Sequence, residues 1–229
     1  MIVDDEVRVE GRRAVFRRMR GRSALPLVLV PGCGRDHHDF DPLLEQLADI
    51  DSDVDVVVLA LPGRAGTPGP PPSSPSAAAA FVRAMLRALS IERALIGGHS
   101  YGGGIAIETA LVDVDGLVAG LFLLSTGARL RVHPALLESV EAAGELVALA
   151  DWRSCDSFDR IADVERISVP TVVVAGADDV LTPPRYARLL HERIAGSQLF
   201  VVDGAGHELP TTHPAAVAAA LAPLLCLDR

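Results

Sequence analysis

A serine flanked by glycines, in the stretch GGHSYGG, is the residue of this sequence that most clearly could do chemistry. Ser100 lies in the pattern Gly98-His99-Ser100-Tyr101-Gly102, which matches G-x-S-x-G. A strand-like apolar run precedes it and a helix-like run follows it, which is the setting of a turn that exposes a nucleophilic hydroxyl. The pattern is also that of an ordinary glycine-rich turn, so the chemistry depends on partners elsewhere in the chain.

The partners that a nucleophilic serine needs occur at the ends of later strand-like runs. A base must take the hydroxyl proton, and a carboxylate must orient that base. Asp178 and Asp179 end the run VVVAGADD, and His207 follows the run FVVDGAG. Serine, aspartate and histidine in this chain order form one of the known arrangements of a catalytic triad. Spacing alone leaves both aspartates open as the acid.

From LVLVPGCG to GAGHELP, the chain resembles the α/β-hydrolase superfamily, and in particular its serine esterases with a short cap. In that family the acid stands three residues after the glycine of a G-x-x-D-x-x-x-P stretch. Gly176, Asp179 and Pro183 match this stretch, so the resemblance implies Asp179 rather than Asp178 as the acid. The stretch PGCG is similar to the family's His-Gly-x-Gly oxyanion loop, with Pro31 in place of the histidine.

An oxyanion formed during acyl transfer needs backbone N–H donors that already point at it. One donor comes from the residue after the nucleophile, which here is Tyr101. The resemblance implies the amide of Cys33 as the other. Four further residues are expected to border the substrate pocket or its entrance: His38, Phe40, Trp152 and Phe158. Packing of a cap against the sheet explains the last two equally well.

Six short apolar runs, rich in valine, leucine and isoleucine, predict the strands that position these residues. They span residues 25–32, 54–63, 93–100, 117–127, 171–179 and 198–207. Such continuous runs are typical of parallel strands buried on both faces, and helical apolar spacings lie between them. Residues 6–21 are expected to form two antiparallel strands that meet near Gly11. The fold class is therefore α/β: a doubly wound, mostly parallel sheet flanked by helices.

The 229 residues show no sharp change in composition, which predicts a single domain over residues 1–229. Residues 127–169 are too many for a plain connection and contain the helical pattern PALLESVEAAGELVALA. We expect them to form a small helical cap or lid over an open or shallow pocket. We also expect Ser76 to cap the helix that begins with AAAAF.

Charge and composition exclude several classes of protein. A net charge of −9 argues against a nucleic-acid partner. No apolar stretch reaches the roughly 18 residues that span a bilayer, and the acidic N-terminus lacks the pattern of a secretion signal, so no membrane partner and a cytoplasmic location are expected. The sequence contains no lysine, which excludes Schiff-base chemistry, Ser-Lys dyads and phosphate loops ending in Gly-Lys.

No metal or cofactor site is expected from the sequence. The HHDFD run offers His37, His38, Asp39 and Asp41, but their spacing matches no metal signature and is typical of a solvated loop leading into a helix. The stretch GCGRDH begins like a dinucleotide-binding loop but lacks the third glycine. We therefore expect a reaction that needs no cofactor.

These observations predict a serine hydrolase that acts on a small carboxylic ester or a related thioester, lactone or amide through Ser100, His207 and Asp179. Two alternatives stay open. The same triad could serve acyl transfer or cyclisation in a biosynthetic pathway, or the chain could bind a small molecule without turning it over. The sequence does not determine the acyl group or the oligomeric state.

Overall fold

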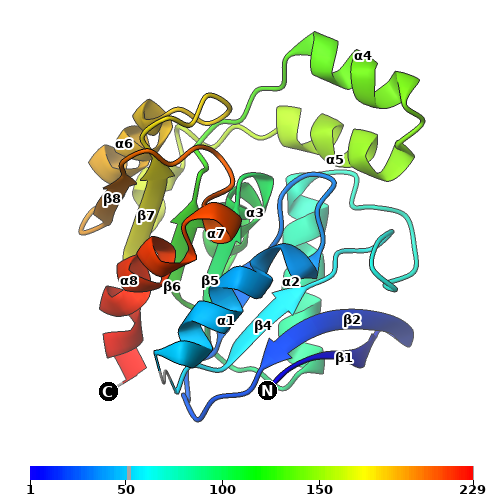
Figure 1. Ribbon diagram of the computed structural model, residues 1–229. Coiled ribbons are helices and arrows are strands. Elements are labelled where there is room, and N and C mark those ends of the chain that lie inside the picture. Colours follow the sequence, from blue (N-terminus) through cyan, green and yellow to red (C-terminus); the bar gives the residue numbers. More distant parts are fainter. Residues whose placement is uncertain (51–52, 229) are drawn as a thin grey trace.

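A single sheet of eight strands runs through the computed structural model, which describes residues 1–50 and 53–228 (Figure 1). The strands are β1 (Ile2–Val9), β2 (Arg12–Met19), β3 (Leu27–Val30), β4 (Val56–Leu59), β5 (Ala94–His99), β6 (Val118–Leu124), β7 (Thr171–Gly176) and β8 (Gln198–Val202). Their order in the sheet is β1-β2-β4-β3-β5-β6-β7-β8. The β1–β2 and β2–β4 pairs are antiparallel and the others are parallel. The predicted mostly parallel sheet with an antiparallel start is confirmed, although β1 begins earlier than expected.

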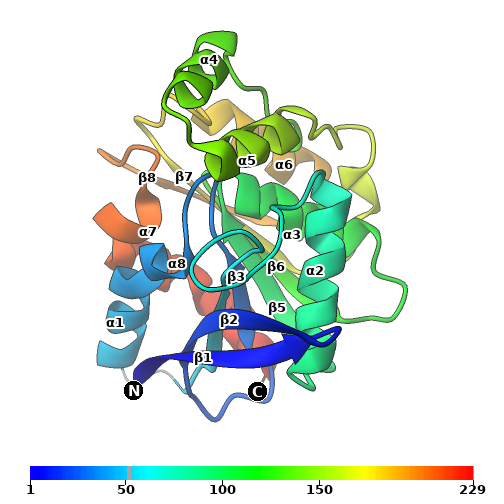
Figure 2. The ribbon, with the colours of Figure 1, turned by 90° about the vertical axis from the view of Figure 1, so that its right-hand side faces the viewer.

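Helices cover both faces of the sheet (Figure 2). The helices are α1 (Asp41–Asp49), α2 (Pro75–Ala88), α3 (Tyr101–Leu111), α4 (Pro134–Ala142), α5 (Leu146–Asp156), α6 (Pro184–Arg193), α7 (Leu209–Thr212) and α8 (Pro214–Leu225), with short 3-10 turns η1 (His37–Phe40), η2 (Val164–Arg166) and η3 (Cys226–Asp228). One apolar core joins the sheet to α2, α3 and α6, and a second joins it to α1, α7 and α8. Strands buried between two such cores explain the continuous apolar runs of the sequence.

The start of α2 differs from the prediction by two residues. Ser74, not Ser76, is the cap, because its Oγ accepts a hydrogen bond of 3.1 Å from the Ala77 amide. Pro75 then occupies the first helical position, where its missing N–H removes no helical hydrogen bond. The Ser76 hydroxyl instead donates to the Glu108 carboxylate, at 2.6 Å.

The segment between β6 and β7 carries α4 and α5, which contact each other beyond the carboxyl ends of the strands (Figure 1). The predicted helical pattern is split in two at Gly144, whose φ of +72° favours glycine and ends α4. Among the helices of the described residues, none has both the length and the apolar character that a bilayer span requires.

Candidate active site

Ser100 lies on the sharp turn between β5 and α3, with φ +56° and ψ −120°. This conformation is costly for a residue other than glycine, so the surrounding structure must stabilise it. A Cβ on Gly98 would lie 2.3 Å from the carbonyl carbon of Gly102, and one on Gly102 would lie 2.0 Å from the carbonyl oxygen of Val30. The two glycines of the motif are therefore required by the close approach of β5, α3 and β3. The Thr126 hydroxyl fixes the turn further by donating to the Ser100 carbonyl, at 2.7 Å.

Asp179 and His207 meet at the carboxyl end of the sheet, although they follow different strands. The Asp179 Oδ2 atom lies 2.9 Å from His207 Nδ1. The other carboxylate oxygen accepts hydrogen bonds from the amides of Leu181 and Thr182, at 2.9 and 2.8 Å. Because the Asp179 side chain is fully buried, these donors fix its direction. His207 therefore presents Nδ1 to the carboxylate and keeps Nε2 free for a second partner.

The neighbouring charges keep Asp179 ionised. Burial alone would raise the pKa of its carboxyl group, but the hydrogen bond and charge of His207 and the donors of Thr182 outweigh burial and lower the pKa. Asp178 has a different environment. Its amide donates to the Ala205 carbonyl, at 2.9 Å, and its exposed carboxylate makes no hydrogen bond within the described residues. Of the two aspartates, only Asp179 contacts His207.

His99 was not expected at this site from the sequence, but its ring packs against His207. Its Nε2 atom is hydrogen-bonded to the His207 carbonyl oxygen at 2.8 Å, and the two rings lie 4.8 Å apart. Burial, followed by the proximity of His207, lowers the pKa of His99 to about 4. His99 is therefore neutral near pH 7, so it can donate to the carbonyl without placing a positive charge beside His207. The only signal in the sequence is its position just before Ser100.

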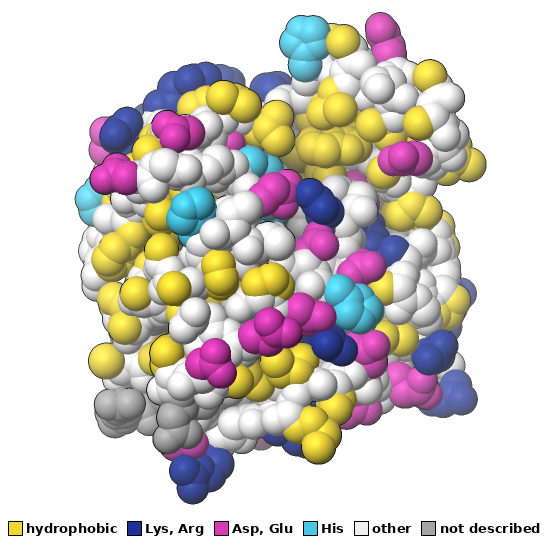
Figure 3. Space-filling view, viewed as in Figure 1, with side chains coloured by type: hydrophobic (Ala, Val, Ile, Leu, Met, Phe, Trp, Pro, Cys, Tyr) yellow, Lys and Arg dark blue, Asp and Glu magenta, His cyan; other side chains and the backbone are white. Residues whose placement is uncertain are grey.

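A cavity of about 240 Å³ opens beside Ser100 and His207. Its other lining residues come from the cap segment and from the loop between β7 and α6 with the start of α6: Leu130, Arg131, Val132, His133, Leu136, Trp152, Cys155, Val180, Leu181, Thr182 and Tyr186. Figure 3 shows apolar side chains gathered around the cap helices. Val180 and Leu181 are 86% and 55% exposed, so the rim is open to solvent and apolar. Within the described residues, no hydrogen bond joins Ser100 to His207, but both face this cavity.

The loop after β3 lies directly against Ser100. A Cβ built on Gly32 would lie 3.4 Å from the Ser100 Cβ. In the part of the chain that the structure describes, the amides of Cys33 and Tyr101 donate to no protein acceptor. Burial, followed by the nearby Cys155, raises the pKa of the Cys33 thiol well above its ordinary value. The thiol therefore stays protonated, and the free amide is the group that Cys33 offers.

Helix α5 is joined by Asp151 to this loop and to the loop after β4. Asp151 Oδ1 lies 2.6 Å from the guanidinium of Arg64, and the two side chains are 1% and 8% exposed. Asp151 Oδ2 accepts a hydrogen bond of 2.9 Å from the Gly34 amide, directly after Cys33. One turn along the helix, the Ser154 hydroxyl is hydrogen-bonded to that of Tyr101. These three α5 contacts could not be predicted from the sequence because their partners lie far apart in the chain.

The structure brings only one of the four expected pocket residues to the cavity, namely Trp152. Phe40 is 1% exposed and packs in the core between the sheet and α1. Phe158 is also 1% exposed and packs in the opposite core, next to Gly104. His38 points toward Asp36 instead. The expectation for these three residues is corrected: the aromatic rings are buried in the cores, and the imidazole is in a polar cluster elsewhere.

A model of the alpha/beta hydrolase family matches residues 27–220, most of the chain. The chain belongs to this family. The pimeloyl-[acyl-carrier protein] methyl ester esterase of Neisseria meningitidis serogroup B is 29% identical, with 89% of this chain and 96% of the relative covered. A putative carbamate hydrolase, RutD, of Pseudomonas savastanoi pv. phaseolicola is 25% identical, with 82% and 88% covered.

Solved structures show the same fold. A thermophilic esterase superposes with a TM-score of 0.85 at 24% identity, covering 99% of this chain and 98% of its own. The enol-lactonase of Burkholderia xenovorans LB400 superposes with a TM-score of 0.80 at 17% identity, covering 97% and 100%. At these identities the likeness concerns the fold.

Proposed function

We propose that this protein is a serine hydrolase that cleaves a carboxylic ester, with Ser100 as nucleophile, His207 as general base and Asp179 as the acid that orients it. The observation that carries the proposal is the 2.9 Å contact of His207 with the buried Asp179 carboxylate, at a cavity that His207 shares with Ser100. A serine on a strained strand-to-helix turn and an oriented imidazole are the two parts that acyl transfer needs.

The reaction follows from these positions. Ser100 Oγ attacks the ester carbonyl carbon while its proton passes to His207 Nε2, and the Asp179 carboxylate stabilises the resulting imidazolium. The oxyanion accepts hydrogen bonds from the amides of Cys33 and Tyr101. His207 then returns the proton to the leaving alcohol. Water attacks the acyl-Ser100 ester with His207 again as base, which releases the carboxylic acid and regenerates the serine.

The cavity supports a small substrate with an apolar acyl group. Its volume of about 240 Å³ lies near the lower end of ligand pockets, and leucine and valine side chains form much of its wall. The names of the relatives favour esters as the substrate class. The Neisseria relative is a methyl ester esterase, and this chain covers nearly its whole length.

A fluorophosphonate probe, which reacts with activated serines, tests the nucleophile directly. We expect the wild type to be labelled at one serine, and Ser100→Ala and His207→Ala to remain unlabelled. Ser73→Ala, in the exposed loop before α2, is the control and should label like the wild type. Labelling of Ser100→Ala at the wild-type level would contradict the proposal.

Turnover of 4-nitrophenyl butyrate tests the assignment of the acid. Asp179→Asn should lower kcat by about 10⁴-fold, because the imidazole loses the partner that selects its tautomer. Asp178→Asn is the matched control and should retain activity within a few-fold. Equal losses in the two variants would contradict the role of Asp179.

A further inference from the structure

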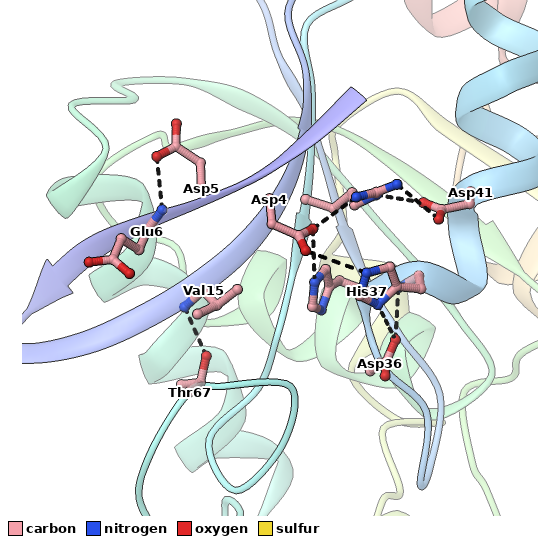
Figure 4. A network of polar contacts seen from close by, with 10 residues as sticks. Asp4, Asp5, Glu6, Val15, Asp36, His37, Asp41 and Thr67 are labelled. Atoms are coloured by element: carbon pink, nitrogen blue, oxygen red, sulfur yellow. Dashed lines mark hydrogen bonds and ion pairs between the residues drawn. The ribbon is translucent and has the colours of Figure 1, made fainter. Parts of the chain in front are cut away.

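Asp4, His37 and His38 form a cluster on the side of the molecule where the β1–β2 hairpin passes η1 (Figure 4). One donor atom from each of the three side chains lies within 4.8 Å of the other two. His37 Nε2 is 3.3 Å from Asp4 Oδ1, and His38 Nε2 is 3.6 Å from Asp4 Oδ2. None of the three residues lines the cavity beside Ser100. The cluster is therefore separate from the proposed hydrolase site.

His37 is the unusual member of the cluster because it is buried and its Nε2 approaches the Asp4 carboxylate, at 3.3 Å, without the geometry of a hydrogen bond. The residue is 1% exposed, and neither ring nitrogen makes a hydrogen bond within the described part of the chain. Buried polar groups are nearly always satisfied, and an unseen ion is one explanation for an exception. A neutral imidazole has a nitrogen lone pair that a metal ion can take as its ligand.

The neighbours hold the two other side chains in place. His38 Nδ1 is hydrogen-bonded to Asp36 Oδ1 at 3.1 Å, which leaves Nε2 on the side of Asp4. Histidines that bind metals are commonly oriented by a carboxylate in this way. Arg17 donates to Asp4 at 3.0 Å, but it also pairs with both oxygens of Asp41, at 2.7 and 3.1 Å. Asp41 thus offsets the positive charge, and Asp4 keeps lone pairs for another partner.

We propose that Asp4, His37 and His38 bind a Zn²⁺ ion, with the two Nε2 atoms and one carboxylate oxygen as ligands and water as the fourth. Tetrahedral zinc with bonds of about 2.0–2.2 Å separates neighbouring ligand atoms by about 3.3–3.5 Å. The observed histidine–carboxylate separations, 3.3 and 3.6 Å, are close to these values but involve different oxygens of Asp4, so the three donor atoms, which lie within 4.8 Å of one another, would move closer together when the ion binds. Two imidazoles and one carboxylate favour zinc over Mg²⁺ and Ca²⁺, which prefer oxygen ligands throughout.

The ion would connect two segments that are distant in the sequence. Asp4 belongs to β1, at the edge of the sheet, and the histidines belong to η1, which follows the loop that contains Cys33. Asp4 and His38 are about half exposed, so an ion can enter from solvent without crossing the core. The site is structural in this arrangement: it fastens the β1–β2 hairpin to the body of the protein and satisfies His37.

Zn²⁺ titration of the chelator-treated full-length protein by calorimetry tests the proposal. The measurements use a Cys226→Ser background, because that exposed thiol could bind zinc itself. We expect one site, a thermal midpoint that rises with Zn²⁺ concentration, and no comparable effect of Mg²⁺. Co²⁺ bound in place of Zn²⁺ should show the visible absorption of a tetrahedral complex. Absence of Zn²⁺ binding by the protein would overturn the proposal.

Variants locate the site. His38→Ala should weaken Zn²⁺ binding by more than about tenfold and still fold, because its side chain is about half exposed. Asp36→Ala should weaken it by about 10–100-fold through the loss of the orienting carboxylate. His213→Ala is the matched control, a histidine outside the cluster whose loss should leave binding unchanged. Wild-type affinity in His38→Ala would overturn the proposal.

Discussion

The two helices of the cap, α4 and α5, are neighbours in the sequence but differ in how firmly they are attached to the rest of the protein. Asp151, Ser154 and Cys155 of α5 are buried, and the first two are hydrogen-bonded to residues beside Ser100. Helix α4 has no buried residue. The same insertion thus contains one helix that forms part of the wall behind the loop that contains Cys33 and one that only covers the cavity. The sequence of α4 can therefore change without disturbing the amides of Cys33 and Tyr101 beside Ser100.

The largest loss of unfolding free energy is expected from Asp151→Ala. The substitution leaves the Arg64 guanidinium buried without its partner and the Gly34 amide without an acceptor. Losing one member of a buried pair costs about 3–5 kcal/mol of unfolding free energy, measurable by urea denaturation. Removing both charges in Asp151→Ala/Arg64→Ala should restore part of this loss. A double variant that is less stable than the single one would argue against an uncompensated charge as the cause.

A second ion pair, between Glu108 of α3 and Arg160 in the loop after α5, predicts that the stability of the protein depends on pH. Glu108 is 2% exposed and binds Arg160, just beyond α5, at 2.6 and 3.0 Å. Burial raises the pKa of Glu108, but the hydrogen bonds of Arg160 and Ser76 outweigh it and lower the pKa. The stabilisation is therefore complete above the unfolded value of about 4.5 and is lost as the pH falls through the lower folded value.

Glu108→Gln should accordingly lower the unfolding free energy by about 1–3 kcal/mol at pH 7, and by less at pH 3. Glu138→Gln, an exposed carboxylate on α4, is the control and should change stability by less than about 0.5 kcal/mol at both pH values. A difference from the wild type that does not shrink in acid would contradict the role of the ionised Glu108 carboxylate.

A smaller loss of unfolding free energy is expected from a substitution at Gly144, which separates the two helices. Its φ of +72° is unfavourable for alanine, so Gly144→Ala should cost about 1 kcal/mol. Because α4 has few buried contacts, the strain should appear locally, as faster hydrogen exchange in α4 with unchanged exchange in α5. Equal acceleration in both helices would show that the cap moves as one body.

The smallest effect on stability is expected from Leu136→Ala on α4. This half-buried side chain lines the cavity, so its loss should change the unfolding free energy by no more than about 0.5 kcal/mol. If the proposed esterase reaction is correct, KM for a butyrate ester should rise by about fivefold relative to an acetate ester, since apolar contact is lost. Unchanged KM for both esters would place the acyl group elsewhere in the cavity.

Much of the fold could be predicted because the burial of a strand or helix determines which of its positions are apolar. Strands between two apolar cores must be apolar on both faces, so β3 to β7 appear as continuous runs. Helix boundaries were less predictable. Ser74 and Ser76 both suit a helix start, and the choice depended on Pro75 and on the distant Glu108. The break at Gly144 likewise reflects a local conformation that the apolar pattern does not record.

The sequence by itself determined that Ser100, an aspartate and His207 each follow a different strand of a parallel sheet, whose carboxyl ends lie at one edge. Spacing left both aspartates open, the resemblance implied Asp179, and the tertiary structure shows that the Asp179 carboxylate contacts His207. Only the tertiary structure decided the burial of Phe40 and Phe158, the anchoring of α5 and the meeting of Asp4 with His37. The positions of the strands along the chain follow from local apolar patterns, whereas side-chain partners depend on contacts between segments far apart in the chain.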